Sequence, residues 1–206
     1  MADAPVVHII DDDASIRTAL DSLFRSTGLA TGLYDSVAAF MQAPPSPDAP
    51  GCLVLDVRLP GMSGLDFQER LAELGVRLPA VLMTGHGDIP MSVRGMKAGA
   101  VDFLTKPFRD QDMLDAVAAA LARDRERRAG ETKIDALNAQ FATLSPRERQ
   151  VMALVAAGKM NKQVAGDLAL SEITVKIHRG AAMRKMGART LADLVRMAEA
   201  LNLRPE

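Results

Sequence analysis

Acidic, hydroxyl and basic side chains stand where several short apolar runs of the sequence end. Three are carboxylates, one is a hydroxyl and one is an ammonium: Asp11, Asp12, Asp56, Thr84 and Lys106. Three crowded carboxylates would repel one another unless a cation lay between them, and hard oxygen ligands with room for water suit Mg²⁺. A lysine and a hydroxyl beside them would stabilise the charge of a phosphoryl group. The residue types therefore predict a phosphoryl site that works by positioning and charge stabilisation.

These side chains can act together only if they meet at one edge of a sheet. Apolar runs bounded by Pro, Gly or polar residues predict five strands, at residues 6–10, 30–34, 53–56, 79–83 and 100–105. Segments with a helical apolar period lie between them, at residues 16–27, 37–41, 65–74 and 91–98, and a further one begins at 112. Strands that alternate with helices over short loops predict a doubly wound α/β domain with a parallel sheet. The carboxyl ends of its strands border the crevice where ligands bind.

Three residues near this edge have competing interpretations. An aspartate after a strand, such as Asp56, can also cap a turn or a helix, but the same design of apolar run and carboxylate recurs at Asp11, which favours a site. Asp13 is interpreted as a charge at a helix N-terminus. His86 lies between two glycines with no second His or Cys nearby. We therefore expect a loop role for it rather than phosphate donation or metal binding.

Composition divides the chain in two. Through residue 122 there are 9 Lys and Arg against 16 Asp and Glu, and from residue 123 onward 16 against 10. An acidic part suits a cation, and a basic part suits phosphate backbones. No apolar run is long enough to span a membrane and the first residues lack a basic secretory start, so we expect a soluble cytoplasmic protein. Cys52, the single cysteine, is expected to be a buried hydrophobe.

Residues 6 to about 120 resemble the receiver domain of two-component response regulators, which is flavodoxin-like. The motifs that carry the resemblance are the acidic pair after the first strand, LDVRLPGMSG, MTGHGD and KAGAVDFLTKPF. The resemblance implies that Asp56 is the phosphoacceptor and that Thr84 and Lys106 bind the phosphoryl oxygens. Phe103 matches the family's switch aromatic, and the Lys106-Pro107 bond matches its cis peptide.

The resemblance also implies a set of Mg²⁺ ligands. Asp12 would bind the metal directly, Asp11 largely through water, and the phosphoacceptor Asp56 with one oxygen. The backbone carbonyl of Arg58 would complete the protein ligands.

Residues 123–144 are expected to form a helical linker that joins the receiver, at 1–122, to the rest. The helix begins before them, with a charged run at 123–128 and a possible bend at Gly130. Apolar residues resume at Ile134 and Leu137 with helical spacing. A spacer, a dimer contact and a docking surface for the second module all remain open interpretations.

Residues 145–206 predict a small bundle of helices. Ser145 and Pro146 are typical of a helix start, two short helices follow around a tight turn, and Thr190 caps a last helix whose apolar residues, Leu191 among them, are expected to face inward. This is helix-turn-helix architecture. The third helix, 172–186, has one apolar face for the core and an opposite face with cations that could enter a major groove. Its two faces are expected to carry Val175, His178, Ala182 and Met186 inward, and Lys176, Ile177, Gly180 and Arg184 outward, with Arg179 on the flank.

The segments LSPRERQV, NKQVAGDL and TVKIHR resemble the LuxR-type output domain. The resemblance implies binding of double-stranded promoter DNA, with Lys176 and Ile177 at base edges. Phosphate contacts are expected from Lys162, Thr174 and Arg184, beside the flanking Arg179. Gly180 departs from the family, since many relatives have a long polar side chain there.

Taken together, the resemblances imply a bacterial transcriptional regulator of the FixJ and NarL class rather than an enzyme. A sensor histidine kinase would phosphorylate Asp56, and the receivers would then pair through a face that includes Val93 and Lys97. RNA polymerase is a further expected partner. Two alternative functions remain. One is a phosphotransferase of the haloacid dehalogenase kind, although the second acid of that family's motif is missing here because Arg58 follows Asp56-Val57. The other is an interaction module that binds no DNA.

Overall fold

The computed structural model describes residues 4–85 and 89–203 and divides the chain into two compact units, Met1–Arg128 and Ala129–Glu206. We call them the N-terminal and C-terminal units and describe each by itself. His86, expected to have a loop role, lies outside the described residues.

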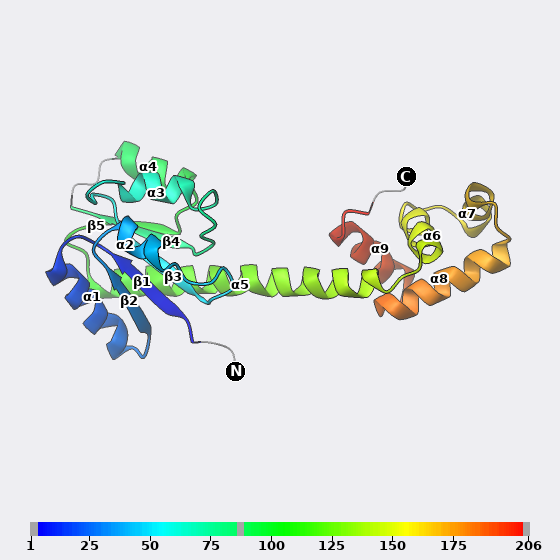
Figure 1. Ribbon diagram of the computed structural model, residues 1–206, viewed down its shortest axis with the longest axis horizontal. Helices are drawn as coiled ribbons and strands as arrows, with labels where there is room; N and C mark the ends of the chain where they lie inside the picture. The colour runs from blue at the N-terminus through cyan, green and yellow to red at the C-terminus, as the bar shows by residue number, and fades with distance from the viewer. Residues whose placement is uncertain (1–3, 86–88, 204–206) are drawn as a thin grey trace. The chain divides into compact units, whose positions relative to one another are not determined.

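A parallel sheet forms the centre of the N-terminal unit (Figure 1). Within the described ranges its five strands are β1 (Val6–Ile10), β2 (Ala30–Tyr34), β3 (Gly51–Asp56), β4 (Ala80–Thr84) and β5 (Asp102–Thr105). They lie side by side in the order β2-β1-β3-β4-β5. Every residue of the central strand β3 is buried, as an apolar run covered on both faces requires. The predicted parallel α/β fold is confirmed.

Helices cover both faces of this sheet (Figure 1). They are α1 (Ala14–Ser26), α2 (Val37–Gln42), α3 (Gly64–Arg70), α4 (Ile89–Lys97) and the first part of α5 (Asp110–Ala142). Leu20 and Phe24 of α1 and Met113 of α5 pack in one cluster against one face, while Phe40 of α2 and Phe67 of α3 pack in another against the opposite face.

Helix α5 is longer than the other helices and runs without interruption through Gly130. Its residues after 128 fall within the C-terminal unit, where Leu137 and Phe141 pack against that unit's core. The end of α5 is therefore part of the C-terminal bundle.

The C-terminal unit is a bundle completed by α6 (Pro146–Ala156), α7 (Asn161–Leu168), α8 (Glu172–Met186) and α9 (Leu191–Ala200). Ser145 begins α6 with a capping box, in which its Oγ accepts from the N–H of Glu148 and the Glu148 carboxylate accepts from the N–H of Ser145. The helix-turn-helix turn passes through Ala169, whose φ is 53°.

One expectation about this bundle is wrong. Leu191, expected to face inward, is 47% exposed, because it is the first residue of α9 and the buried part of that helix begins at Leu194.

Among residues 4–85 and 89–203, the structure has no helix with the length and apolarity needed to cross a membrane.

Candidate functional site

Asp11, Asp56 and Lys106 meet at the carboxyl edge of the sheet. The Lys106 ammonium Nζ lies 2.6 Å from Asp11 Oδ2 and 2.7 Å from Asp56 Oδ1. Both carboxylates are buried and Lys106 is partly exposed. Two acids that arise 45 positions apart therefore share one cation, and the cation comes from a third strand end.

Strand register explains this meeting. β1 and β3 are neighbours with Ile10 opposite Leu55, so Asp11, which follows β1, lies beside Asp56, the last residue of β3. The backbone N–H of Lys106 donates to the carbonyl of Thr84 over 2.7 Å, which fixes the end of β5 beside the end of β4. The Lys106–Pro107 peptide bond is cis, as the sequence resemblance implied.

Backbone groups hold the two carboxylates in place. Asp11 Oδ1 accepts from the N–H of Asp13 over 2.9 Å, and Asp56 Oδ2 accepts from the N–H of Arg58 over 2.6 Å. The guanidinium of Arg17 donates to the carbonyl oxygen of Asp11 over 2.6 Å. Each acid is thus restrained by its own loop as well as by the shared lysine.

The loop after Asp56 approaches β3 so closely that it requires a glycine. A Cβ on Gly64 would lie 2.0 Å from the carbonyl oxygen of Asp56, inside the contact distance of any real side chain. The N–H of Gly64 donates to the carbonyl of Val57 over 3.0 Å. Gly64 therefore fixes the backbone on which Asp56 stands.

Burial and charge act in opposite directions at this site. Burial raises the pKa of Asp56, and the hydrogen bond and charge of Lys106 offset that rise only in part. Burial also acts to lower the pKa of Lys106, but the hydrogen bonds and charges of Asp11 and Asp56 together outweigh it and leave that pKa raised. Asp56 is consequently a carboxylate whose ionised form depends on a neighbouring cation.

The remaining predicted receiver residues differ from one another in how far they are buried. The Asp12 side chain is exposed, whereas Thr84 is fully buried at the end of β4. Phe103 on β5 is half-buried and packs against the core that lies under α2 and α3. Its ring comes within 3.4 Å of the position a Cβ would take on Gly95 of α4.

The acidic residues at this edge offer oxygen ligands of the kind that suits Mg²⁺. Within the described ranges, no three His, Cys, Asp or Glu side chains are grouped closely enough to hold a metal by themselves. Asp11 and Asp56 nevertheless present buried carboxylate oxygens with only one ammonium between them. Asp12 follows Asp11 directly in sequence, and Arg58 lies two residues after Asp56. Mg²⁺ prefers hard oxygen ligands, takes only a few of them from the protein and keeps several of its waters. This set of oxygen atoms therefore fits Mg²⁺.

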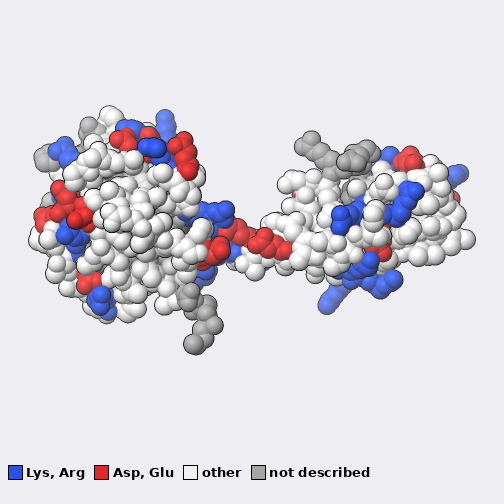
Figure 2. Space-filling model, in the orientation of Figure 1, with Lys and Arg blue, Asp and Glu red and all other residues white. Residues whose placement is uncertain are grey.

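Predicted DNA-contacting residues occupy the outward side of α7 and α8. Lys162, Lys176 and Arg184 are exposed, and Ile177 is 63% exposed. Figure 2 shows Lys and Arg side chains along the edge of the C-terminal unit where Figure 1 draws α8. These positions are open to a phosphate backbone.

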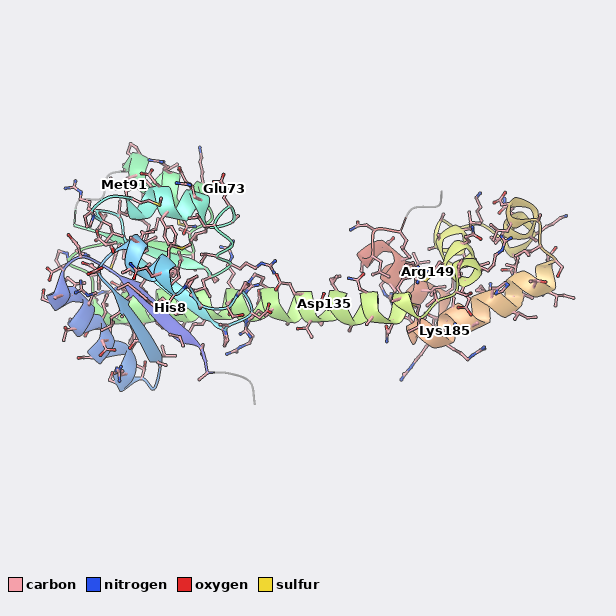
Figure 3. All side chains as sticks on the ribbon, viewed as in Figure 1. His8, Glu73, Met91, Asp135, Arg149 and Lys185 are labelled. Carbon is pink, nitrogen blue, oxygen red and sulfur yellow. The ribbon has the colours of Figure 1, made fainter. Side chains whose placement is uncertain are left out.

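Three polar residues of α8 are engaged within the unit. Thr174 Oγ1 lies 2.8 Å from Ser171 Oγ, and Arg179 Nη1 donates to Asn161 Oδ1 over 3.2 Å, which joins α8 to α7. Lys185, labelled in Figure 3, donates to Glu148 Oε2 over 2.7 Å. Arg179 and Lys185 thus help to fix the orientation of α8.

The predicted pairing face on α4 is open. Val93 is 45% exposed and Lys97 is exposed, and both line a shallow depression. Arg94, between them, forms ion pairs with Asp66 at 2.9 Å and Glu69 at 2.6 Å, which tie α4 to α3.

Sequence reasoning missed Asp124. The charged run at 123–128 resembles a solvated surface, yet the Asp124 side chain is 1% exposed. It accepts from the N–H of Gly51 over 3.2 Å at the start of β3, and pairs with Arg127 at 2.7 Å and Arg128 at 2.8 Å. The spacing of an acid with arginines three and four positions later was the available signal. It indicates pairing but does not indicate burial.

Comparison with protein families assigns both units. The family model described as "Response regulator receiver domain" matches residues 7–118. The model described as "Bacterial regulatory proteins, luxR family" matches residues 142–198. Each motif-based resemblance in the sequence therefore falls within a match.

Relatives cover both regions at once. The chain is 57% identical over 198 residues to Nodulation protein W of Bradyrhizobium diazoefficiens, a match that spans 96% of this chain and 87% of that protein. It is 44% identical to the transcriptional regulatory protein FixJ of Azorhizobium caulinodans over 96% of this chain and 93% of that one.

Solved structures give the same result. The response regulator StyR matches with a TM-score of 0.81 and 46% identity, over 96% of this chain and 99% of that chain. Full-length FixJ from B. japonicum matches with a TM-score of 0.58 and 38% identity, over 96% and 97%.

Proposed function

The chain belongs to the response regulators of two-component systems that carry a LuxR-type DNA-binding domain, a family of transcription factors rather than enzymes, and we propose that phosphorylation of Asp56 controls its binding to promoter DNA. The observation that carries the proposal is the shared contact of Lys106 with Asp11 and Asp56. It sets a buried carboxylate beside the cation that a phosphoryl group would need.

The donor in this proposal is the phosphohistidine of a sensor kinase. A carboxylate oxygen of Asp56 forms a bond to phosphorus as the P–N bond breaks, and the electron pair returns to the imidazole ring. Lys106, already within 2.7 Å of Asp56 Oδ1, neutralises charge on the transferred group. Thr84, at the end of the adjacent strand β4, offers its hydroxyl to a phosphoryl oxygen.

Asp11, Asp12, Asp56 and the carbonyl of Arg58 would hold Mg²⁺. The metal would supply positive charge beside the phosphoryl oxygens. The backbone hydrogen bonds at Asp11 and Asp56 orient the carboxylates for this task.

The new phosphoryl group biases a packing switch. When Thr84 moves toward it, space opens for Phe103, which is only half-buried on the edge strand β5. Phe103 adjoins Gly95 of α4, so its movement repacks the α4 surface that carries Val93 and Lys97. Two receivers then pair through that surface.

Pairing brings two C-terminal units to half-sites about 34 Å apart, one turn of DNA. Base edges are contacted by Lys176 and Ile177. The DNA phosphates are contacted by Lys162, Thr174, Arg179 and Arg184. RNA polymerase is the partner through which bound protein would alter transcription. Substitution of Lys162 weakens all DNA sequences alike, whereas substitution of Lys176 changes which sequence is preferred.

Mass spectrometry and DNA selection test the proposal together. Protein incubated with acetyl phosphate and Mg²⁺ should gain about 80 Da, and treated protein should enrich one sequence from genomic fragments more strongly than untreated protein. Asp56→Asn should show neither effect. An unmodified wild-type mass, or an Asp56→Asn protein that binds as tightly as the phosphorylated wild type at equal salt, would contradict it.

A further inference from the structure

Two isoleucines project from the side of α8 that faces away from its core. Ile173 is 70% exposed and Ile177 is 63% exposed, while Val175, Ala182 and Met186 of the same helix are buried. Residues four positions apart lie on one helical face, so the two isoleucines form a single apolar surface. That surface occupies the first half of the helix.

Toward the end of the helix, the same outward side carries first a glycine and then a cation. Gly180 follows Ile177 on this side and has no side chain, and Arg184 comes next. A Cβ on Gly180 would lie 3.6 Å from Arg184 Nη1, so the guanidinium reaches back over the glycine. Lys176, beside Ile177, is exposed. Cations therefore flank the apolar surface, which gives it the charge that suits DNA.

Stability does not account for the two isoleucines. An exposed Ile contributes little to packing, and its β-branched side chain is less favourable in a helix than Ala, Lys or Arg. Neither side chain can donate or accept a hydrogen bond. An apolar surface of this kind can read one feature of a base edge in the major groove, the methyl group of thymine.

We propose that Ile173 is a specificity-determining residue of this protein, and that with Ile177 it contacts thymine methyl groups in each half-site. The inference rests on the proposed function, because it places α8 in the major groove. The N-terminal part of a recognition helix is the part that reaches base edges, and Ile173 is the second residue of α8. The operator should therefore hold thymines where Ile173 and Ile177 lie.

The test removes single methyl groups from the DNA. A preferred site is selected with the acetyl-phosphate-treated full chain, and each thymine is then replaced in turn by deoxyuridine, which lacks only the methyl. Binding is measured at constant salt for wild type, Ile173→Ala and Ile173→Val. Ile134→Ala, which truncates a 38% exposed isoleucine on α5, is the matched control. Thermal unfolding confirms that each variant is folded.

For wild type and Ile134→Ala, deoxyuridine at one position should weaken binding about fourfold, the effect of losing one buried methyl. Ile173→Ala should bind the thymine site more weakly and show no further loss with deoxyuridine there, with Ile173→Val intermediate. If Ile173→Ala retains the full deoxyuridine effect at every position, or loses self-association instead of DNA affinity, the inference is wrong while the proposed function stands. A wild-type chain that selects no sequence would overturn both.

Discussion

At the scale of single residues, the candidate site is a pair of buried carboxylates that share one ammonium. Lys106 compensates both Asp11 and Asp56, and its own pKa is raised in return. Because burial raises the pKa of Asp56, the fraction of Asp56 that is ionised depends on Lys106, and the proposed attack on phosphorus requires the ionised form. In the proposed function, the lysine thus sets the reactivity of Asp56 before any phosphoryl group arrives.

Replacing Lys106 tests this dependence. Lys106→Met should slow phosphorylation by acetyl phosphate about 100-fold through the loss of charge stabilisation. It should also raise the pKa of Asp56 further, which moves the acid side of the pH–rate profile to higher pH. Rates are measured by intact-protein mass spectrometry across pH. Lys133→Met, at an exposed position on α5, should leave the pH–rate profile unchanged. Identical pH–rate profiles for wild type, Lys106→Met and Lys133→Met would refute this role of Lys106.

His8 provides a second prediction, on stability. It lies buried on β1 (Figure 3), with Nδ1 3.2 Å from the Tyr34 hydroxyl, and burial lowers its pKa from 6.5 to about 4. Because the unfolded chain takes up a proton near pH 6.5 and the folded chain does not, this contribution to stability is complete above pH 6.5. It is lost as the pH falls toward 4, by at most about 1.4 kcal/mol per pH unit.

Denaturant unfolding between pH 4 and 8 measures this effect. His8→Gln should be less stable at pH 8 but should lose less stability than wild type between pH 6.5 and 4. Parallel pH dependences for the two proteins would show that His8 does not cause the slope.

Sequence alone located the residues that end strands but not those that are paired inside the fold. Asp11, Asp56 and Lys106 were predictable because each interrupts an apolar run, and parallel strands bring such ends together. Asp124 and the Arg17 contact with the Asp11 carbonyl were not, because an acid or arginine on a helix gives no sign of which loop or strand it will meet.

At the scale of elements, α4 lies against the sheet because Gly95 has no side chain. A Cβ there would lie 2.6 Å from Leu82 Cδ1 on β4 and 3.4 Å from Phe103 Cδ2 on β5. Gly130 of α5 has nothing within 4 Å of the same position. The two glycines therefore differ only in whether a neighbour is present.

Replacing glycine with alanine is therefore predicted to have opposite effects on stability at Gly95 and Gly130. Gly95→Ala should destabilise the protein by about 1–3 kcal/mol, as overpacking does. Gly130→Ala should stabilise it by up to about 1 kcal/mol, because alanine favours the helix. Urea unfolding followed by circular dichroism measures both. A stabilising Gly95→Ala would show that α4 moves away from the sheet freely.

The predicted element boundaries agree with the structure where local signals mark them, and the largest difference is at the end of α3. The predicted bounds of β1, β2 and α8 agree with the structure because caps or abrupt polar residues mark their ends. Helix α3, predicted over residues 65–74, ends at Arg70, where turns lead to Gly75 with φ 73°. Its apolar residue Leu74 still packs against the core, so periodicity continued beyond the helix.

At the scale of the whole molecule, each unit has its own buried core. Leu53 and Met113 belong to clusters of the N-terminal unit, whereas Met152 and Val151 belong to clusters of the C-terminal unit. We expect two unfolding transitions. Tyr34, the only tyrosine in a chain without tryptophan, reports on the first unit by fluorescence, while circular dichroism detects both.

Truncation of each core should therefore shift one transition. Leu53→Ala should lower the stability reported by Tyr34, and Met152→Ala should lower only the other transition, each by about 2–5 kcal/mol. A single transition that both variants shift equally would show that the units unfold together.

Cys52 gives the molecule an internal reporter. It is the sole cysteine, lies fully buried on β3, and burial together with the charge of Asp124 raises the pKa of its thiol to about 12. Alkylating reagents react with exposed thiolates, so this sulfur is protected while the strand that bears Asp56 stays packed. A maleimide dye directed to an introduced surface cysteine would leave the native thiol unmodified, and slow labelling of Cys52 itself would time the opening of the sheet around the proposed phosphoacceptor.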